Sequence, residues 1–216
     1  ITLLRCAVGP VSSVLFTSFV AYGMSRKNLR WRKFFNVWAL IPMFFGGGLI
    51  PYYLLCKMLG LLNTFAIYII PGMYSVYNMI LIRSFFKSTP EELHEAAVLD
   101  GAGEFRIYFQ LMIPLCMPVL ITIFMWSFIG HWNDYLTSML YCPQRPDLDS
   151  LQYVLRQIIA AADAGSFDSV LSVSGKATSE TISYAAMTFG ALPLIVIFPF
   201  VQKYLTQGVY VGSLKG

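Results

Sequence analysis

The sequence predicts an all-α protein built as a polytopic bundle of membrane helices. Hydrophobic residues make up 57% of the 216 residues, charged residues make up only 12%, and the mean hydropathy is +0.64. Soluble domains carry about 25% charged residues. Five hydrophobic stretches of roughly 20 residues, the length that crosses a hydrocarbon core, alternate with more polar segments. This composition excludes an ordinary soluble domain and gives no support to nucleic-acid binding.

The first two spans flank a strongly basic loop. The first span, about residues 3–24, is long enough to cross a bilayer, and residues 25–33 behind it carry five basic side chains. Such a loop is expected in the cytoplasm. The second span, about residues 34–56, contains helix-breaking residues, namely Pro42, Gly46, Gly47, Gly48 and Pro51. We expect a bend there, which serves gating or is a static kink.

The third span, about residues 64–86, carries two polar candidates for a substrate path. Tyr74 and Asn78 are one helical turn apart in sequence and are expected on one face. A polar amide in a membrane helix should face protein or a cavity. Asn78 therefore serves either an interhelical hydrogen bond or contact with a solute.

The fourth span, about residues 115–136, ends in aromatic and polar side chains. Trp132 suits the aromatic belt at a membrane interface. Asn133 and Asp134 can hydrogen-bond hydroxyl groups, and Trp132 offers an apolar surface for stacking. These three residues are candidates for the substrate path, and the alternative is that they fix the end of the helix.

An outer segment, residues 139–180, leads to the last span, about residues 181–201. Apolar residues recur in it with helical spacing, at Leu151, Val154, Leu155, Ile158 and Ile159. This pattern predicts an amphipathic helix on the outer membrane face or on the bundle. Ten Lys or Arg residues fall in the segments predicted to be inside and four in those outside, which supports this orientation.

The most polar long stretch, residues 88–113, is expected to be a cytoplasmic loop with two helical segments. Thr89 suits an N-cap, Pro90 the first helical position, and Thr89 with Glu92 the spacing of a capping box. Gly101 and Gly103 should end this helix. On physical grounds alone it is either an ordinary loop helix or a helix that inserts into a partner's groove.

The spacing within this loop resembles a known family motif. Glu95-Ala96-Ala97, three residues, Gly101, nine residues and Leu111-Met112-Ile113-Pro114 resemble the EAA loop of ATP-binding-cassette (ABC) importer permeases, with two aliphatic residues exchanged. The resemblance implies that this loop contacts a partner ATPase. The residues it implies for that contact are Glu92, Glu95, Ala96, Ala97, Asp100 and Gly101.

Two further segments resemble the carbohydrate class of these permeases, in the smaller subunit of the maltose-transporter type. Gly130-x-Trp132-Asn133-Asp134-Tyr135-Leu136 is similar to their GxWNDFL element, and Gln202-Lys203-Tyr204 with Gly212–Gly216 is similar to their tail. The run 151–156 looks like the branch that imports larger oligosaccharides. The resemblance implies that the solute for which these residues are substrate-path candidates is a sugar.

The resemblance also implies the assembly and its location. Such type I importer permeases usually have six spans, so we expect one further span before Ile1. They work in the bacterial cytoplasmic membrane with a second permease, two cytoplasmic ATP-binding subunits and an extracellular solute-binding protein. ATP and Mg²⁺ would be bound by the partner ATPase.

No catalytic pair, metal spacing or cofactor motif appears in the sequence, so we expect no enzyme activity in this chain. Gly175-Lys176 is a near miss to a phosphate-binding loop, but Val170 replaces its first glycine and Ala177 its hydroxyl residue. Two rival functions stay open, a permease of the same superfamily for a non-sugar solute and an ATP-independent secondary transporter. Proton-coupled transporters usually carry intramembrane carboxylates, and only Asp134 lies near a span.

Overall fold

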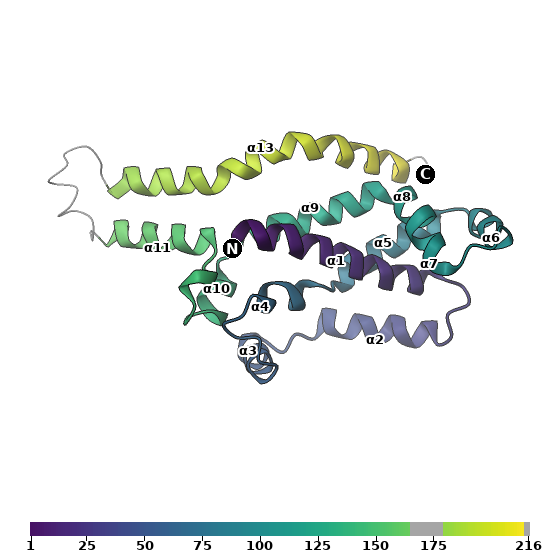
Figure 1. The fold of residues 1–216 in the computed structure, drawn as a ribbon, viewed down its shortest axis with the longest axis horizontal. Helices are drawn as coiled ribbons and strands as arrows, with labels where there is room; N and C mark the ends of the chain where they lie inside the picture. Colours follow the sequence, from purple (N-terminus) through teal and green to yellow (C-terminus); the bar gives the residue numbers. More distant parts are fainter. Residues whose placement is uncertain (165–178, 214–216) are drawn as a thin grey trace.

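The computed structural model describes residues 1–164 and 179–213, and all regular secondary structure within these ranges is helical. Helix α1 (Thr2–Ser25) runs along the middle of an elongated bundle, with α5 (Val76–Ser88) and α9 (Met117–Asn133) packed against it (Figure 1). The predicted all-α class is therefore confirmed.

Small and hydroxyl side chains let the neighbouring helices approach α1 closely. The buried face of α1 includes Gly9, Ser13, Thr17, Ser18 and Ala21. The Thr17 hydroxyl donates to the carbonyl of Met73 at 3.1 Å, and the hydroxyls of Ser18 and Tyr108 lie 2.7 Å apart. These polar groups are satisfied inside the bundle, as a bilayer environment requires.

The region of the predicted second span forms two helices. Helices α2 (Arg32–Phe44) and α3 (Leu49–Met58) are bent by 115° relative to each other. The break falls at the glycine run, where Gly48 has a φ of +83°, a conformation that glycine adopts without a Cβ clash. The bend expected within residues 34–56 is therefore present at the glycine run, whereas Pro42 stays inside α2.

The region of the predicted third span is also interrupted. It contains α4 (Ala66–Ile69), a 3₁₀ turn η1 (Ile70–Gly72) that holds a Pro-Gly pair, and then α5. Ser75 has extended backbone angles, and its Oγ accepts a hydrogen bond from the backbone amide of Asn78 at 3.4 Å. A continuous helix over residues 64–86 is corrected to two pieces, because a serine cap starts a new helix after the turn.

Helix α6 (Glu91–Leu99) lies at one end of the bundle, which we call the α6 end. It is followed by α7 (Glu104–Ile107), a single π-helical turn η2 (Tyr108–Met112) and α8 (Ile113–Leu115). This segment meets α9 at an angle of 82°. The second helical segment expected over residues 104–113 is present, with a π turn that the sequence did not predict.

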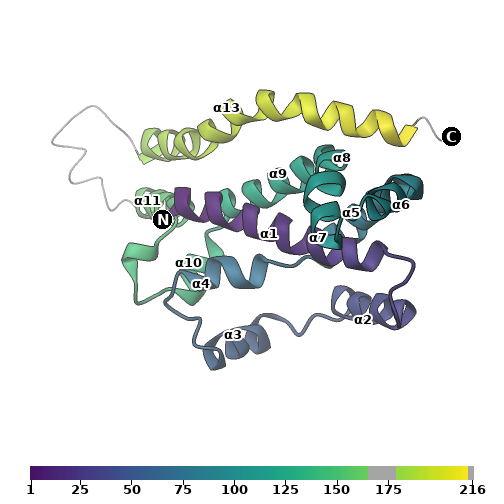
Figure 2. The same cartoon turned by 45° about the vertical axis from the view of Figure 1, so that its right-hand side comes forward.

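The opposite end, which we call the α11 end, holds α10 (Leu136–Tyr141), the short turn η3 (Pro146–Leu148) and α11 (Leu151–Asp163). Helix α11 lies beside the first half of the long helix α13 (Ser179–Ser213), as Figures 1 and 2 both show. The predicted amphipathic helix therefore packs on the bundle.

Several sequence features fall outside the described residues. Residues 165–178 include the near miss at Gly175-Lys176 and much of the predicted outer loop, and residues 214–216 form the end of the family-like tail.

Two described helices are individually long and apolar enough to cross a membrane, namely α1 and the Glu180–Pro199 part of α13. The number rises to four when each bent pair, α2 with α3 and residues 104–115 with α9, is taken as one span. By length and composition, the described residues thus contain several candidate spans. The region 64–86 is not among them because its helices are too short.

Candidate functional site

The start of α6 differs by one residue from the prediction. Pro90 has extended backbone angles (φ −56°, ψ 135°), so the helix begins at Glu91 and has no side-chain cap. The Thr89 hydroxyl instead donates to the Phe85 carbonyl of α5 at 3.5 Å, which turns it away from α6. The predicted capping box is therefore wrong, although Glu91 and Glu92 still place negative charge at the positive end of the helix dipole.

The end of α6 is a glycine-dependent turn. Gly101 has a φ of +77°, and its amide donates to the Val98 carbonyl at 2.9 Å. The Ala102 amide donates to the Ala97 carbonyl at 2.9 Å, which completes a Schellman motif. The prediction that Gly101 ends the helix is confirmed. Gly103 instead has an extended conformation and precedes α7.

Helix α6 presents one face to the surroundings and the other to the bundle. Glu92, Glu95, Ala96 and Leu99 are exposed and recur at the spacing of a single helix face. We call these four residues the α6 outer face. Leu99 is 87% exposed, so this face offers a partner an apolar side chain beside two carboxylates.

Of the other residues implied in ATPase contact, Asp100 is exposed beside this face and Ala97 is not part of it. Ala97 packs against the main hydrophobic core, below α6. Its small side chain therefore permits close packing of α6 on the bundle, whereas Ala96 is the alanine that a partner can approach.

A polar cluster fastens the inner side of α6. The His94 ring is 9% exposed, and its Nδ1 lies 2.8 Å from Nη2 of Arg26 at the end of α1. Its Nε2 lies 3.3 Å from Oε1 of Glu104. The other carboxylate oxygen of Glu104 accepts a hydrogen bond from the Tyr22 hydroxyl. Helix α6 is thus tied to both α1 and α7.

A second, more exposed contact joins the first turn of α6 to the basic loop. Lys27 forms an ion pair with Glu91, and the hydrogen bond from Lys27 lowers the pKa of the Glu91 carboxyl. Neither this pair nor His94 was predicted from the sequence. The available signal was spacing, because His94 lies on the side of the helix away from Glu92, Ala96 and Leu99.

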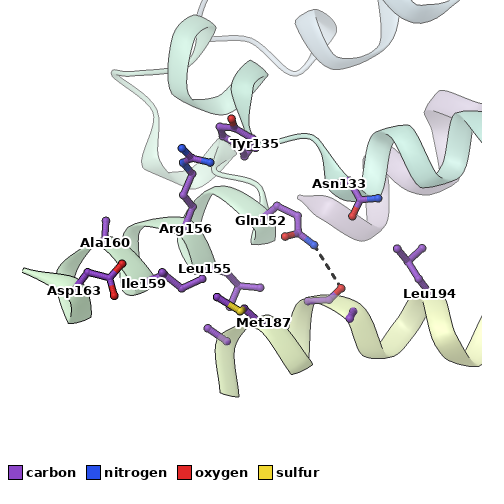
Figure 3. A pocket seen from close by; sticks show the side chains of 13 residues that line it. Asn133, Tyr135, Gln152, Leu155, Arg156, Ile159, Ala160, Asp163, Met187 and Leu194 are labelled. Atoms are coloured by element: carbon purple, nitrogen blue, oxygen red, sulfur yellow. Dashed lines mark hydrogen bonds between the residues drawn. The ribbon is translucent and has the colours of Figure 1, made fainter. Parts of the chain in front are cut away.

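The substrate-path candidates of the fourth span lie at the α11 end, near a cavity of about 640 Å³ between α11 and α13 (Figure 3). Its polar lining consists of Asn133, Tyr135, Gln152, Arg156 and Asp163. The Arg156 guanidinium lies 4.3 Å from the centre of the Tyr135 ring. The Gln152 side-chain amide donates to the Gly190 carbonyl of α13 at 3.4 Å.

Trp132 is placed differently from its neighbour Asn133. Its side chain is 5% exposed, and the indole N–H donates to the Gly190 carbonyl at 2.9 Å. Trp132 thus packs α9 against α13, and its ring offers no open stacking surface in this structure. Asn133 alone of the predicted substrate-path residues lines the 640 Å³ cavity.

Asp134 takes part in a buried ion pair that was not predicted from the sequence. Arg5 Nη2 lies 2.5 Å from Asp134 Oδ2, and the Arg5 side chain is 2% exposed. The other carboxylate oxygen accepts a hydrogen bond from the Thr137 amide at 3.1 Å, at the start of α10. Arg5 and Asp134 both line a second cavity of about 330 Å³, together with Tyr68 and His131.

Tyr74 and Asn78 line neither of these two cavities. Tyr74 lies before the first residue of α5, so the two residues do not share the helical face expected of them. The Tyr74 ring packs edge-on against Phe16 of α1, with 6.3 Å between ring centres.

These features define a class of protein, the permease subunit of an ABC importer, in which a membrane helix bundle exposes a short loop helix at one end. The chain belongs to the family of binding-protein-dependent transport system inner membrane components, which it matches over residues 13–210. The predicted family membership is confirmed.

Relatives and a solved structure agree with this assignment. The chain is 33% identical to the polygalacturonan/rhamnogalacturonan transport system permease protein YtcP of Bacillus subtilis (strain 168), over 97% of this chain and 73% of YtcP. It is 30% identical to the maltodextrin transport system permease protein MdxG of the same organism, over 95% of this chain and 70% of MdxG. A chain in the crystal structure of a bacterial ABC transporter involved in import of the acidic polysaccharide alginate matches with a TM-score of 0.86 and 30% identity, over 94% of this chain and 72% of that chain.

Proposed function

We propose that this chain is the permease subunit of an ATP-driven, binding-protein-dependent importer of oligosaccharides in the bacterial cytoplasmic membrane. The observation that carries the proposal is the α6 outer face, which stays exposed while the inner side of the same helix is fastened to the bundle. In this assembly α6 is the coupling helix, and it docks into a groove of a cytoplasmic ATPase.

The attachment of α6 suits it to transmit force. His94 connects it to Arg26 and Glu104, and the turn at Gly101 connects it to α7, η2 and α8, which lead into α9. A displacement of α6 by the ATPase is therefore passed to α1 and α9 together. The bend at Gly48 is a second place where the bundle can change shape between inward-open and outward-open states.

The substrate class rests on the names of the relatives and on the cavity at the α11 end. The relatives are described as permeases for maltodextrin and for polygalacturonan or rhamnogalacturonan, and the matching structure concerns alginate import. Amide, carboxylate and guanidinium groups around a cavity of 640 Å³ can hydrogen-bond sugar hydroxyls. Asn133 is the predicted substrate-path residue that this geometry supports.

The remaining subunits supply what this chain does not. Two cytoplasmic ATP-binding subunits hold ATP and Mg²⁺, a second permease completes the pathway, and an extracellular solute-binding protein delivers the sugar. The rival proton-coupled mechanism gains no support, because Asp134 is paired with Arg5 and accepts a hydrogen bond from the Thr137 amide.

The test is co-purification of a tagged full-length chain with its partners. We expect Glu95→Lys on the α6 outer face to reduce recovery of the ATPase about tenfold, as for a central residue of an interface. The second permease should stay bound. Glu180→Lys, the same charge reversal at an exposed site in the first turn of α13, is the matched control and should leave ATPase recovery unchanged. Recovery of the wild-type chain without any ATPase would contradict the proposal.

A further inference from the structure

A basic pocket of about 290 Å³ lies at the α6 end, separate from the α6 outer face. It is formed by the loop after α1, the start of α2, the end of α5 and the first turn of α6. Its charged lining consists of Arg26, Lys27, Arg32, Lys87 and Glu91. Four cations thus face one carboxylate in a small space.

Two of these cations lack a countercharge within the described part of the chain. Lys27 pairs with Glu91, and Arg26 contacts the His94 ring, whereas Arg32 and Lys87 have no ion pair or hydrogen bond to a described residue. Lys87 lies beyond the predicted third span, and its pKa is lowered by loss of water and by the nearby charges of Arg83 and Arg32. The pocket therefore carries unbalanced positive charge.

The surface next to the pocket favours a lipid over a free anion. Helix α2 begins at Arg32 and has no buried residue, and it exposes large apolar side chains directly beyond that arginine. Phe34, Val37 and Trp38 are 56%, 62% and 64% exposed. A molecule with an anionic head and an apolar chain matches this arrangement, with the head in the pocket and the chain along α2. Basic pockets between membrane helices on the cytoplasmic side are typical sites for such head groups.

We propose that this pocket binds the phosphate of an anionic phospholipid of the cytoplasmic leaflet, held by Arg32 and Lys87. The proposal rests on the orientation of the proposed function, in which the α6 end faces the cytoplasm. Pro90, Glu91 and His94 of the α6 segment form one wall of the pocket. A bound phosphate therefore links α2 and α5 beside the first turn of the coupling helix.

The test is lipid binding to the complex of the full-length chain with its partner subunits, measured by native mass spectrometry after removal of lipid. The probes are phosphatidylglycerol, zwitterionic phosphatidylcholine and inorganic phosphate. The test variant is Arg32→Gln with Lys87→Gln. The matched control is Arg30→Gln with Lys33→Gln, which removes the same charge from exposed positions outside the pocket.

We expect the test variant to bind phosphatidylglycerol about 25-fold more weakly, because each cation contributes about fivefold, or about 1 kcal/mol. The control variant should bind within about twofold of wild type, and phosphatidylcholine should bind weakly to all. Arg32→Lys with Lys87→Arg should restore binding, which separates loss of charge from loss of fold.

Three outcomes would overturn the proposal. Equal weakening in both glutamine variants would indicate diffuse attraction to the membrane surface. Binding of phosphatidylcholine as tight as that of phosphatidylglycerol would remove the role of charge. Binding of inorganic phosphate as tight as that of phosphatidylglycerol would identify a site for free anions. Recovery of the ATPase with the wild-type chain is recorded in the same experiment. A wild-type chain that binds the lipid but recovers no ATPase would count against the coupling function alone.

Discussion

Each end of α1 is joined to the rest of the bundle by an ion pair, and the two pairs differ sharply in exposure. At the α11 end, the side chains of Arg5 and Asp134 are 2% and 24% exposed. At the α6 end, those of Lys27 and Glu91 are 72% and 40% exposed. The first pair is embedded among packed helices, and the second stands largely in solvent.

The difference in exposure separates an ion pair that is fixed from one that can adjust. A buried charge is costly when its partner is removed, whereas a pair in solvent contributes little and is screened by salt. The Arg5 guanidinium also lies 4.3 Å from the centre of the Tyr68 ring, which adds a second contact at the buried end. We therefore expect the α11 end to hold one arrangement and the attachment of α6 to respond to its surroundings.

The largest expected effect comes from breaking the buried pair. Asp134→Asn should destabilise the chain by about 3–5 kcal/mol, because it leaves the Arg5 charge buried without a counterion. Thermal unfolding of the purified complex measures this effect. Arg5→Met combined with Asp134→Leu is the control, and it should recover most of the loss because neither charge remains. A fully stable single variant would show that the pair is not a structural joint.

The next largest effect tests how closely α9 approaches α1. A Cβ atom at Gly9 would lie 2.2 Å from Nε2 of His131, so the ring or the helix must move in Gly9→Ala. Overpacking of this kind costs about 1–3 kcal/mol. Gly23→Ala in the same helix is the matched control, since no atom lies within 4 Å of that Cβ. It should stabilise α1 slightly through helix propensity, and equal destabilisation by both variants would contradict close packing at Gly9.

Much of the fold was predictable because hydrophobic length and glycine conformation are local properties. The helical class, the bend at the glycine run and the turn at Gly101 follow from short segments of sequence. The break at Ser75 was not predicted, because a membrane helix and two shorter helices at an angle have the same hydrophobic composition. The one-residue error at Thr89 has a local cause, since that hydroxyl bonds to the preceding helix instead.

The polar contacts were less predictable because they join residues far apart in sequence. Arg5 and Asp134 are separated by 129 positions and Arg26 and His94 by 68, and spacing rules do not reach across such distances. Trp132 shows the same limit, since its indole N–H bonds to the Gly190 carbonyl of α13, and this distant contact buries the ring. Of the α6 outer face, Glu92, Glu95 and Ala96 were named from the family resemblance, and Leu99 was not.

A smaller effect is expected at the turn that ends α6. Gly101→Ala should cost about 1–2 kcal/mol, because a φ of +77° is strained for a residue with a Cβ even where space is free. Gly103→Ala is the matched control two residues away, where the backbone is extended and the space is also open. Transport and membrane abundance should be measured together. A coupling role predicts that Gly101→Ala lowers transport more than abundance, and equal losses would indicate a folding role.

The smallest effect concerns the exposed pair, and its response to salt and pH identifies it. Lys27→Gln should speed hydrogen exchange of the first turn of α6 at low salt, since His94 still holds the rest of the helix. At about 1 M salt, where the screening length is about 3 Å, the difference from wild type should vanish. The pKa of Glu91 is lowered in the folded protein, so the contribution of this pair is present above the ordinary carboxyl pKa and is lost as pH falls through the lowered value. Lys33→Gln, at an exposed position without an ion pair to a described residue, is the control. An effect of Lys27→Gln that persists at high salt would mean that the ion pair at the α6 end is as fixed as the buried pair at the α11 end.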